Sequence, residues 1–197
     1  KSARYGKEEA QGGIFIHLGA VPILENLAVI NNNAPTGGGI YIQGSENLII
    51  NNSTIANNDT YGIIIAGNTN VSLMNSIVWN NSIYFNTWIG SRSITLNYSN
   101  IEGGENSILT NNYSTVTWGS GNIDSDPLFV DAANGDFKLS DTSPAIGTGT
   151  ATGAPSTDID GNTRPYPSGT NPDMGAYENA APTLSPVTAV ATPTNDN

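Results

Sequence analysis

The sequence of 197 residues contains no cysteine, one histidine, and only 6 lysine and arginine residues. The lack of cysteine excludes disulfides and thiolate metal sites, but it does not fix the compartment, because many secreted bacterial proteins also lack cysteine. With 17 Asp and Glu residues the formal net charge is −11 at pH 7. We therefore expect neither redox chemistry nor a nucleic-acid partner.

Long hydrophobic runs are also missing. No segment approaches the length needed to cross a bilayer, and no basic and apolar signal segment stands at the front. The chain does not begin with methionine, so its first residues read as the product of processing or as a piece of something longer. Whether Lys1 is a natural N-terminus stays open.

What the sequence has instead is internal repetition. The phrases GGIFI, GGIYI and GIII place Gly13, Gly39 and Gly62 at the start of successive units, 26 and then 23 residues apart. A second anchor agrees, because VINN, IANN and VWNN recur at the same offsets. Each unit holds short apolar alternations separated by Gly, Asn, Ser and Asp, which is typical of strands of a few residues and excludes a helical solenoid.

This period predicts an all-β solenoid. Two or three short strands per unit fit a parallel β-helix, in which each coil stacks on the last at roughly 4.8 Å. Leucine-rich repeats have a similar period, but their fixed Leu and Asn pattern is missing. We predict about four coils over residues 13–123.

Asparagine recurs at fixed positions in these coils. A side-chain amide can donate to one coil and accept from the next, so a stack of amides satisfies turn backbone and fixes the register. A sugar-binding face lined by the same amides is the functional alternative. The spacing favours two structural ladders, one at Asn31, Asn57 and Asn80 and the other at Asn26, Asn52 and Asn75.

The strict repeat ends before residue 124, and a different set of phrases follows. These are DPLFVD at 126–131, GDFKLSDTSPAIGTG at 135–149, DIDGNTRP at 158–165 and PDMGAYE at 172–178. They resemble the C-terminal end of secreted bacterial right-handed parallel β-helix repeat proteins that carry a "choice-of-anchor" type domain. The resemblance implies a right-handed β-helix and an extracellular or cell-surface location, and it implies little about activity.

The patterns divide the chain into four segments. Residues 1–12 read as an incomplete coil or an N-terminal cap, in front of the coils at 13–123. Residues 124–178 are expected to form a C-terminal capping module, because an open solenoid end exposes strand edges and core. Residues 179–197, rich in Pro, Thr and Ala, read as a linker towards an anchoring element.

Enzymatic chemistry is not favoured on the coils, and we predict no catalytic residue. Glycoside hydrolysis usually needs two carboxyl groups about 5–9.5 Å apart, but no acidic residue aligns with another at the repeat offsets. A lyase needs a base, and between residues 13 and 104 the candidates are His17, expected at the surface, and Arg92, expected to serve a turn. Arg164 is expected to form a structural ion pair with an aspartate of the module.

The phrase DIDGN is similar to the start of a calcium loop. Asp158, Asp160 and Asn162 would present alternate oxygen ligands, but position 170 is Thr where the loop needs a bidentate Glu. A structural turn is therefore expected, with Ca²⁺ kept open as a stabilising ion. No other cofactor is expected.

Aromatic residues gather from the third coil towards the module, and we expect them to pack in the core. A sugar-stacking platform is the alternative. The aromatic residues concerned are Trp79, Tyr84, Phe85, Trp88, Tyr98 and Trp118.

Together these features predict an extracellular structural or adhesive protein that associates end to end into filaments. Its expected partners are copies of itself and extracellular polysaccharide; which glycan stays open. Two alternatives remain. One is the C-terminal part of a polysaccharide lyase or glycoside hydrolase whose catalytic coils lie upstream, and the other is a carbohydrate-binding module.

Overall fold

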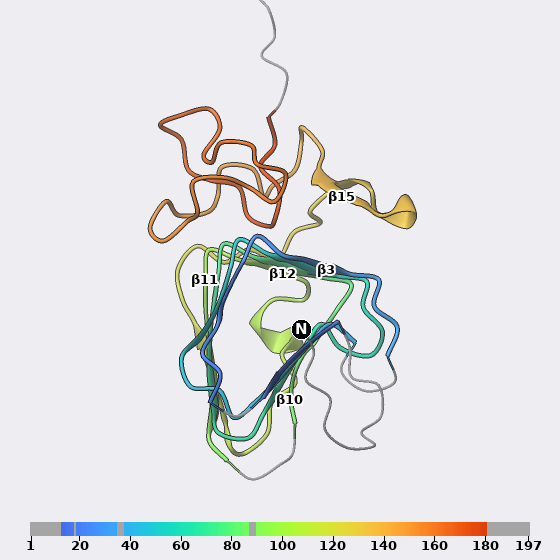
Figure 1. The fold of residues 1–197 in the computed structure, drawn as a ribbon. Helices are drawn as coiled ribbons and strands as arrows, with labels where there is room; N and C mark the ends of the chain where they lie inside the picture. Colours follow the sequence, from blue (N-terminus) through green and yellow to red (C-terminus); the bar gives the residue numbers. More distant parts are fainter. Residues whose placement is uncertain (1–12, 18, 35–37, 87–89, 181–197) are drawn as a thin grey trace, which may run out of the picture.

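The computed structural model describes residues 13–17, 19–34, 38–86 and 90–180. Within these ranges the chain winds into a solenoid with a roughly triangular cross-section, and the orange C-terminal segments lie outside the triangle (Figure 1). Each of four coils contributes one strand to each of three parallel sheets. No helix in these ranges is long and apolar enough to span a membrane. The predicted segment 1–12 and most of 179–197 lie outside the described residues.

The three sheets form the sides of the triangle. Sheet 1 contains β1 (Ile14–His17), β4 (Ile40–Gln43), β7 (Ile63–Ala66) and β10 (Ile83–Phe85). Sheet 2 contains β2 (Ile23–Glu25), β5 (Leu48–Asn51), β8 (Thr69–Met74), β11 (Arg92–Asn97) and β13 (Ser114–Trp118). Sheet 3 contains β3 (Ala28–Ile30), β6 (Thr54–Ala56), β9 (Ile77–Trp79) and β12 (Asn100–Ile101). A short 3-10 helix, η1 (Glu105–Ser107), precedes β13.

Strand pairing confirms the offsets read from the sequence. Ile14 pairs with Ile40 and Ile40 with Ile63, so the three glycine-led phrases stack in register. Further along, Val71 pairs with Ile94. In the fourth coil Ile83 pairs with Ile63, so the loop that leads into β10 is shorter than its counterparts.

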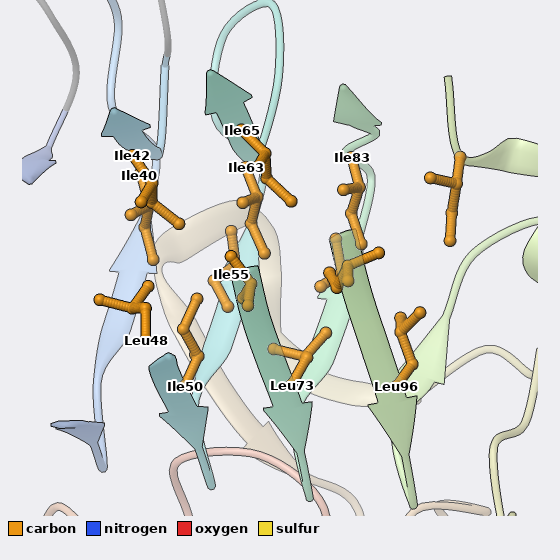
Figure 2. Packing of buried hydrophobic residues seen from close by; sticks show 14 of the residues in the cluster. Ile40, Ile42, Leu48, Ile50, Ile55, Ile63, Ile65, Leu73, Ile83 and Leu96 are labelled. Carbon is orange, nitrogen blue, oxygen red and sulfur yellow. The ribbon is translucent and has the colours of Figure 1, made fainter. Parts of the chain in front are cut away.

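The interior is filled by stacks of like residues, one per coil (Figure 2). Alternate residues of each strand point inward, and β-branched side chains suit the pleated surface. Because equivalent positions of successive coils carry similar apolar residues, the hydrophobic interior is continuous from coil to coil. Burial of each of these side chains contributes about 1.5–3 kcal/mol to stability. Fully buried members are Ile40, Ile42, Leu48, Ile50, Ile55, Ile63, Ile65, Leu73 and Leu96.

The C-terminal module consists of a short hairpin and irregular loops. Its elements are β14 (Phe129–Asp131), η2 (Ala132–Asn134) and β15 (Asp136–Leu139), with β14 antiparallel to β15. We expected this module to close an end of the solenoid. Its contacts instead run along one flank, over the outer face of sheet 3 near the labels β3 and β12 (Figure 1).

Small residues let the module approach sheet 3 closely. Ile77 and Thr54, which belong to neighbouring coils, are 0% and 1% exposed. Gly175 N–H donates to the carbonyl of Asn75 at 2.7 Å, and Ala176 N–H donates to Thr54 Oγ1 at 3.0 Å. The module therefore binds several coils side by side, which a cap on one end would not do.

Candidate functional site

The corners of the coils are made by residues in the left-handed conformation. Asparagine tolerates this region better than most non-glycine residues. Both predicted asparagine stacks lie at such corners, and each has one amide-to-amide bond. Asn80 Nδ2 donates to Asn57 Oδ1 at 3.0 Å, and Asn75 Nδ2 donates to Asn52 Oδ1 at 3.2 Å. The six φ values are 52° for Asn26, 53° for Asn31, 43° for Asn52, 54° for Asn57, 49° for Asn75 and 52° for Asn80.

A more continuous ladder stands one residue further along. Asn32 Nδ2 donates to Asn58 Oδ1 at 2.8 Å, and Asn58 Nδ2 donates to Asn81 Oδ1 at 2.9 Å. Asn58 Nδ2 also reaches the carbonyl of Val29 at 2.8 Å. The sequence prediction placed the ladder on the first asparagine of each Asn-Asn pair. Both asparagines of the pair recur with the same period, so the sequence pointed equally to the second one.

Buried serines form another ladder that sequence reasoning missed. Ser53 N–H donates to Ser76 Oγ at 3.1 Å, and Ser76 N–H donates to Ser99 Oγ at 3.2 Å. Each hydroxyl also donates to the carbonyl two residues before it. Serine recurs at positions 53, 76 and 99 with the spacing of the repeat, and this recurrence was the sequence signal for the ladder.

The stack at Asn26, Asn52 and Asn75 is also the edge on which the module docks. Asn26 Nδ2 donates to the carbonyl of Thr157 at 2.8 Å, and Asn52 Nδ2 donates to that of Asp173 at 3.3 Å. Asn75 bonds Thr150 twice, donating from Nδ2 at 2.9 Å and accepting at Oδ1 at 2.8 Å. These amides join three coils to one module.

Buried charges hold the module together. Arg164 Nε donates to Glu178 Oε2 at 2.9 Å, and both side chains are 0% exposed. Arg164 was expected to pair with an aspartate, and its partner is Glu178. Arg164 also donates to Asn26 Oδ1 at 2.7 Å and to the carbonyl of Gly175 at 3.1 Å, so its guanidinium joins module and solenoid.

Two aspartates of the module have displaced pKa values. Burial raises the pKa of Asp173 to about 6; the Glu178 carboxylate adds to this, while the N–H groups of Asn179 and Gly147 oppose it. For Asp158 burial also raises the pKa, but hydrogen bonds from Glu178, Asn162 and Asp160 outweigh it, so the pKa lies below its ordinary value. Perturbed carboxyls often mark active sites. Here both oxygens of each are occupied by hydrogen-bond donors of the module.

The DIDGN loop is folded as a turn around Asp158. Asp158 Oδ1 accepts the N–H groups of Asp160 and Asn162 at 2.9 and 2.8 Å, and Asp160 pairs with Lys138 at 2.9 Å. Both Asp158 oxygens and Asp160 Oδ2, which would serve Ca²⁺, thus face donors. Across the described ranges no group of three acidic or histidine side chains is placed to hold a metal. The structural turn expected here is present, and a stabilising Ca²⁺ stays the alternative.

A shallow pocket lies beside this loop. It has a volume of about 260 Å³ and is lined by residues that include Lys138, Asp160 and Tyr177. The Lys138 ammonium lies 5.8 Å from the centre of the Tyr177 ring. The single cation of the lining, Lys138, is therefore already engaged with Asp160 and Tyr177.

The two basic candidates on the coils occupy different environments. His17 ends β1 and is exposed, with its ring 5.4 Å from that of Phe15. Arg92 was expected to serve a turn; it opens β11, is 1% exposed inside the coil, and donates from Nη1 to the carbonyl of Asn86, which follows β10. The two residues lie at different positions along the solenoid, in the first and fourth coils.

The predicted aromatic cluster is divided among three environments, and Trp88 lies outside the described residues. Phe85 and Trp118 pack with the solenoid interior. Trp79 and Tyr98 pack against the module. Tyr84 lies on the outer face of sheet 1. Trp79 is therefore an interface residue rather than part of an open platform.

An aromatic row crosses the outer face of sheet 1. It consists of Phe15, Tyr41, Ile64 and Tyr84, which are in register in four successive coils, and of Tyr61, whose ring stacks on Tyr84 at 4.6 Å. Phe15 is 36% exposed and lies 5.5 Å from the Tyr41 ring. The middle of the row is covered, because Tyr41 and Ile64 are only 5% and 3% exposed, so the row reaches solvent at Phe15 and at the half-buried Tyr61 and Tyr84. The outer face of a sheet is commonly polar, so these rings are an unusual feature of the coils.

The three-sided coil, the in-register strands and the polar ladders together define a parallel β-solenoid. The chain belongs to the right-handed β-helix family, because residues 7–127 match the family described as "Right handed beta helix region". This confirms the predicted fold class. No curated protein and no solved structure matched the chain.

Proposed function

We propose that this chain is a rigid structural or adhesive segment held outside the cell or at its surface, and that its aromatic row contacts an extracellular polysaccharide. The observation that carries the proposal is the row itself. Its accessible rings stand at two places along the solenoid axis, Phe15 in the first coil and the stacked pair Tyr61 and Tyr84 near the fourth, as contacts to a linear partner would require.

The surroundings of the row favour a neutral glycan. Tyrosine offers a flat apolar ring with a polar hydroxyl, which suits sugars that have apolar faces and hydroxyl rims. Asn86 Nδ2 donates to Tyr41 Oη at 3.4 Å, so an amide borders the row. The net charge of −11 would repel uronate polymers.

Affinity electrophoresis of the full chain against neutral and uronate polysaccharides tests this proposal. We expect binding to a neutral polymer, with at least a ten-fold loss of affinity for Phe15→Ala and Tyr61→Ala. Tyr113→Ala is the matched control, because Tyr113 is 65% exposed but lies outside the row. Unchanged binding in both row variants, or no binding to any polymer, would contradict the proposal.

End-to-end association is a second proposal with its own support. Within the described part of the chain β13 pairs with β11 alone and β2 with β5 alone, so both borders of sheet 2 carry open backbone groups. Such edges template further strands, and head-to-tail contacts propagate as filaments. Light scattering and electron microscopy of untreated protein would then give long particles with a regular axial repeat. Monodisperse monomers would remove the proposal.

A further inference from the structure

Arg92 is the largest fully buried side chain of the described residues, and it lies inside the fourth coil. It begins β11, where Arg92, Ile94 and Leu96 alternate inward and the latter two belong to the apolar interior. Its neighbours in register are Thr69 in the coil before and Ser114 in the coil after. A cation therefore stands in an otherwise uncharged interior.

Only one of its nitrogens is paired. Nη1 donates to the carbonyl of Asn86 at 2.7 Å, whereas Nε and Nη2 have no hydrogen-bond partner among the described residues. Nε and Nη2 lie on one edge of the planar group, and this is the edge that forms two parallel bonds with carboxylates. Both free donors thus point the same way.

The other buried arginine, Arg164, has the partners that Arg92 lacks. Every nitrogen of Arg164 is bonded, and its Nε meets the carboxylate of Glu178. The ion pairs of the described residues are Arg164 with Glu178 and Lys138 with Asp160, so no carboxylate there meets Arg92. The two arginines are equally buried but differently compensated.

The nearby hydroxyls do not replace the missing anion. Thr69 Oγ1 donates to the carbonyl of Ala66 at 2.6 Å and accepts from Gly44 N–H, and Ser114 Oγ donates to the carbonyl of Asn111 at 2.7 Å. Arginine does not lose its proton in proteins, and an uncompensated buried charge is strongly destabilising. The site therefore calls for a negative charge that the described residues do not supply.

We propose that the Nε and Nη2 edge of Arg92 binds a small monovalent anion of the halide class, chloride in natural surroundings. An enclosed guanidinium admits a monatomic ion more readily than a carboxylate on a larger molecule. Such an ion accepts both N–H donors and cancels the buried charge. Within the fourth coil the guanidinium would then be held by the ion at Nε and Nη2 and by the carbonyl of Asn86 at Nη1.

Thermal unfolding of the full chain at constant ionic strength provides the first test. Replacing sodium gluconate with sodium chloride should raise the melting temperature saturably, by about 3–6 °C at ten times the dissociation constant. Arg92→Met, which removes the charge but keeps an apolar side chain, should lose this chloride dependence. Lys138→Met should keep it, because Lys138 is an exposed cation of the module.

Anomalous diffraction from crystals grown in sodium bromide decides the matter even if Arg92→Met does not fold. A bromide peak within bonding distance of Nε and Nη2 supports the proposal. Absence of that peak overturns it, whatever the melting curves show, and the edge is then met by water.

Discussion

Arg164 and Asn26 lie 138 positions apart in the sequence, yet Arg164 Nη1 donates a hydrogen bond of 2.7 Å to Asn26 Oδ1. One guanidinium therefore links the C-terminal module to a corner of the first coil. The same guanidinium is paired with Glu178 inside the module. One charged group thus contributes both to the cohesion of the module and to its attachment to the solenoid.

Removing the partner of this guanidinium should be costly. We expect Glu178→Gln to lower the free energy of unfolding by about 3–5 kcal/mol, because it leaves Arg164 charged, buried and without a carboxylate. Lys138→Met breaks an exposed ion pair and should change stability by less than about 1 kcal/mol. Urea unfolding measures both. Equal effects of the two variants would mean that the buried pair has no special role.

The module should be most stable in mild acid. The pKa of Asp173 is about 6 in the folded protein against an ordinary 3.8, so folding favours its protonated form. Its stabilising contribution is then present below pH 4 and is lost as the pH rises through 6, on the order of 2–3 kcal/mol. Asp158 acts in the opposite sense: its lowered pKa contributes stability above pH 4 that is lost as the pH falls further. We therefore expect a maximum near pH 4.

Urea unfolding at several pH values, followed by tryptophan fluorescence, checks this maximum, since Trp79 packs against the module. Asp173→Asn is the control, because it removes the titrating group and should flatten the slope between pH 4 and 6. A wild-type slope of the opposite sign in that interval would contradict the assignment.

The continuous asparagine ladder should matter more than the corner stack beside it. Asn58→Ala removes bonds to Asn32, Asn81 and the carbonyl of Val29, and we expect a loss of about 2–3 kcal/mol. Asn57→Ala should cost about 1 kcal/mol, since alanine is strained at a φ of 54°, and Asn57→Gly should cost little. Thermal or urea unfolding ranks the three. A larger loss for Asn57→Ala than for Asn58→Ala would reverse our ranking.

The solenoid could be predicted from sequence because its contacts repeat. Gly13, Gly39 and Gly62 recur at the offset that strand pairing uses, so periodicity alone carried the register. The choice between Asn57 and Asn58 as ladder residue could not be made this way. Both recur with the same period, and only the backbone conformation at the corner decides which amide points along the stack.

The position of the module was not predictable from local patterns. Its phrases suggested a closing element, and an open solenoid end is a plausible target for one. The contacts that place it on sheet 3 join residues such as Asn26 and Thr157, which share no period and no sequence motif. The burial of Arg92 was not predicted either, because its Gly and Ser neighbours are typical of a turn, whereas the residue alternates inward with Ile94.

Docking of the module on sheet 3 should be separable from folding of the coils, and glycine substitutions test this. At Gly175 a Cβ would lie 2.9 Å from both Ile77 Cδ1 and Thr54 Oγ1, at a φ of +97°. We expect Gly175→Ala to detach the module while the apolar interior of the coils persists. Gly161→Ala is the matched control, because Gly161 has a similar φ of +86° but nothing within 4 Å of the added carbon.

Hydrogen exchange measures the two regions separately. In Gly175→Ala the amides of residues 143–178 should lose protection, whereas those of β4, β5 and β8 should keep it. Gly161→Ala should show only the backbone strain of a left-handed alanine, about 1–2 kcal/mol, without loss of docking. Equal loss of protection throughout the chain in Gly175→Ala would mean that module and coils unfold as one unit, and the flank contacts would then be part of the solenoid fold itself.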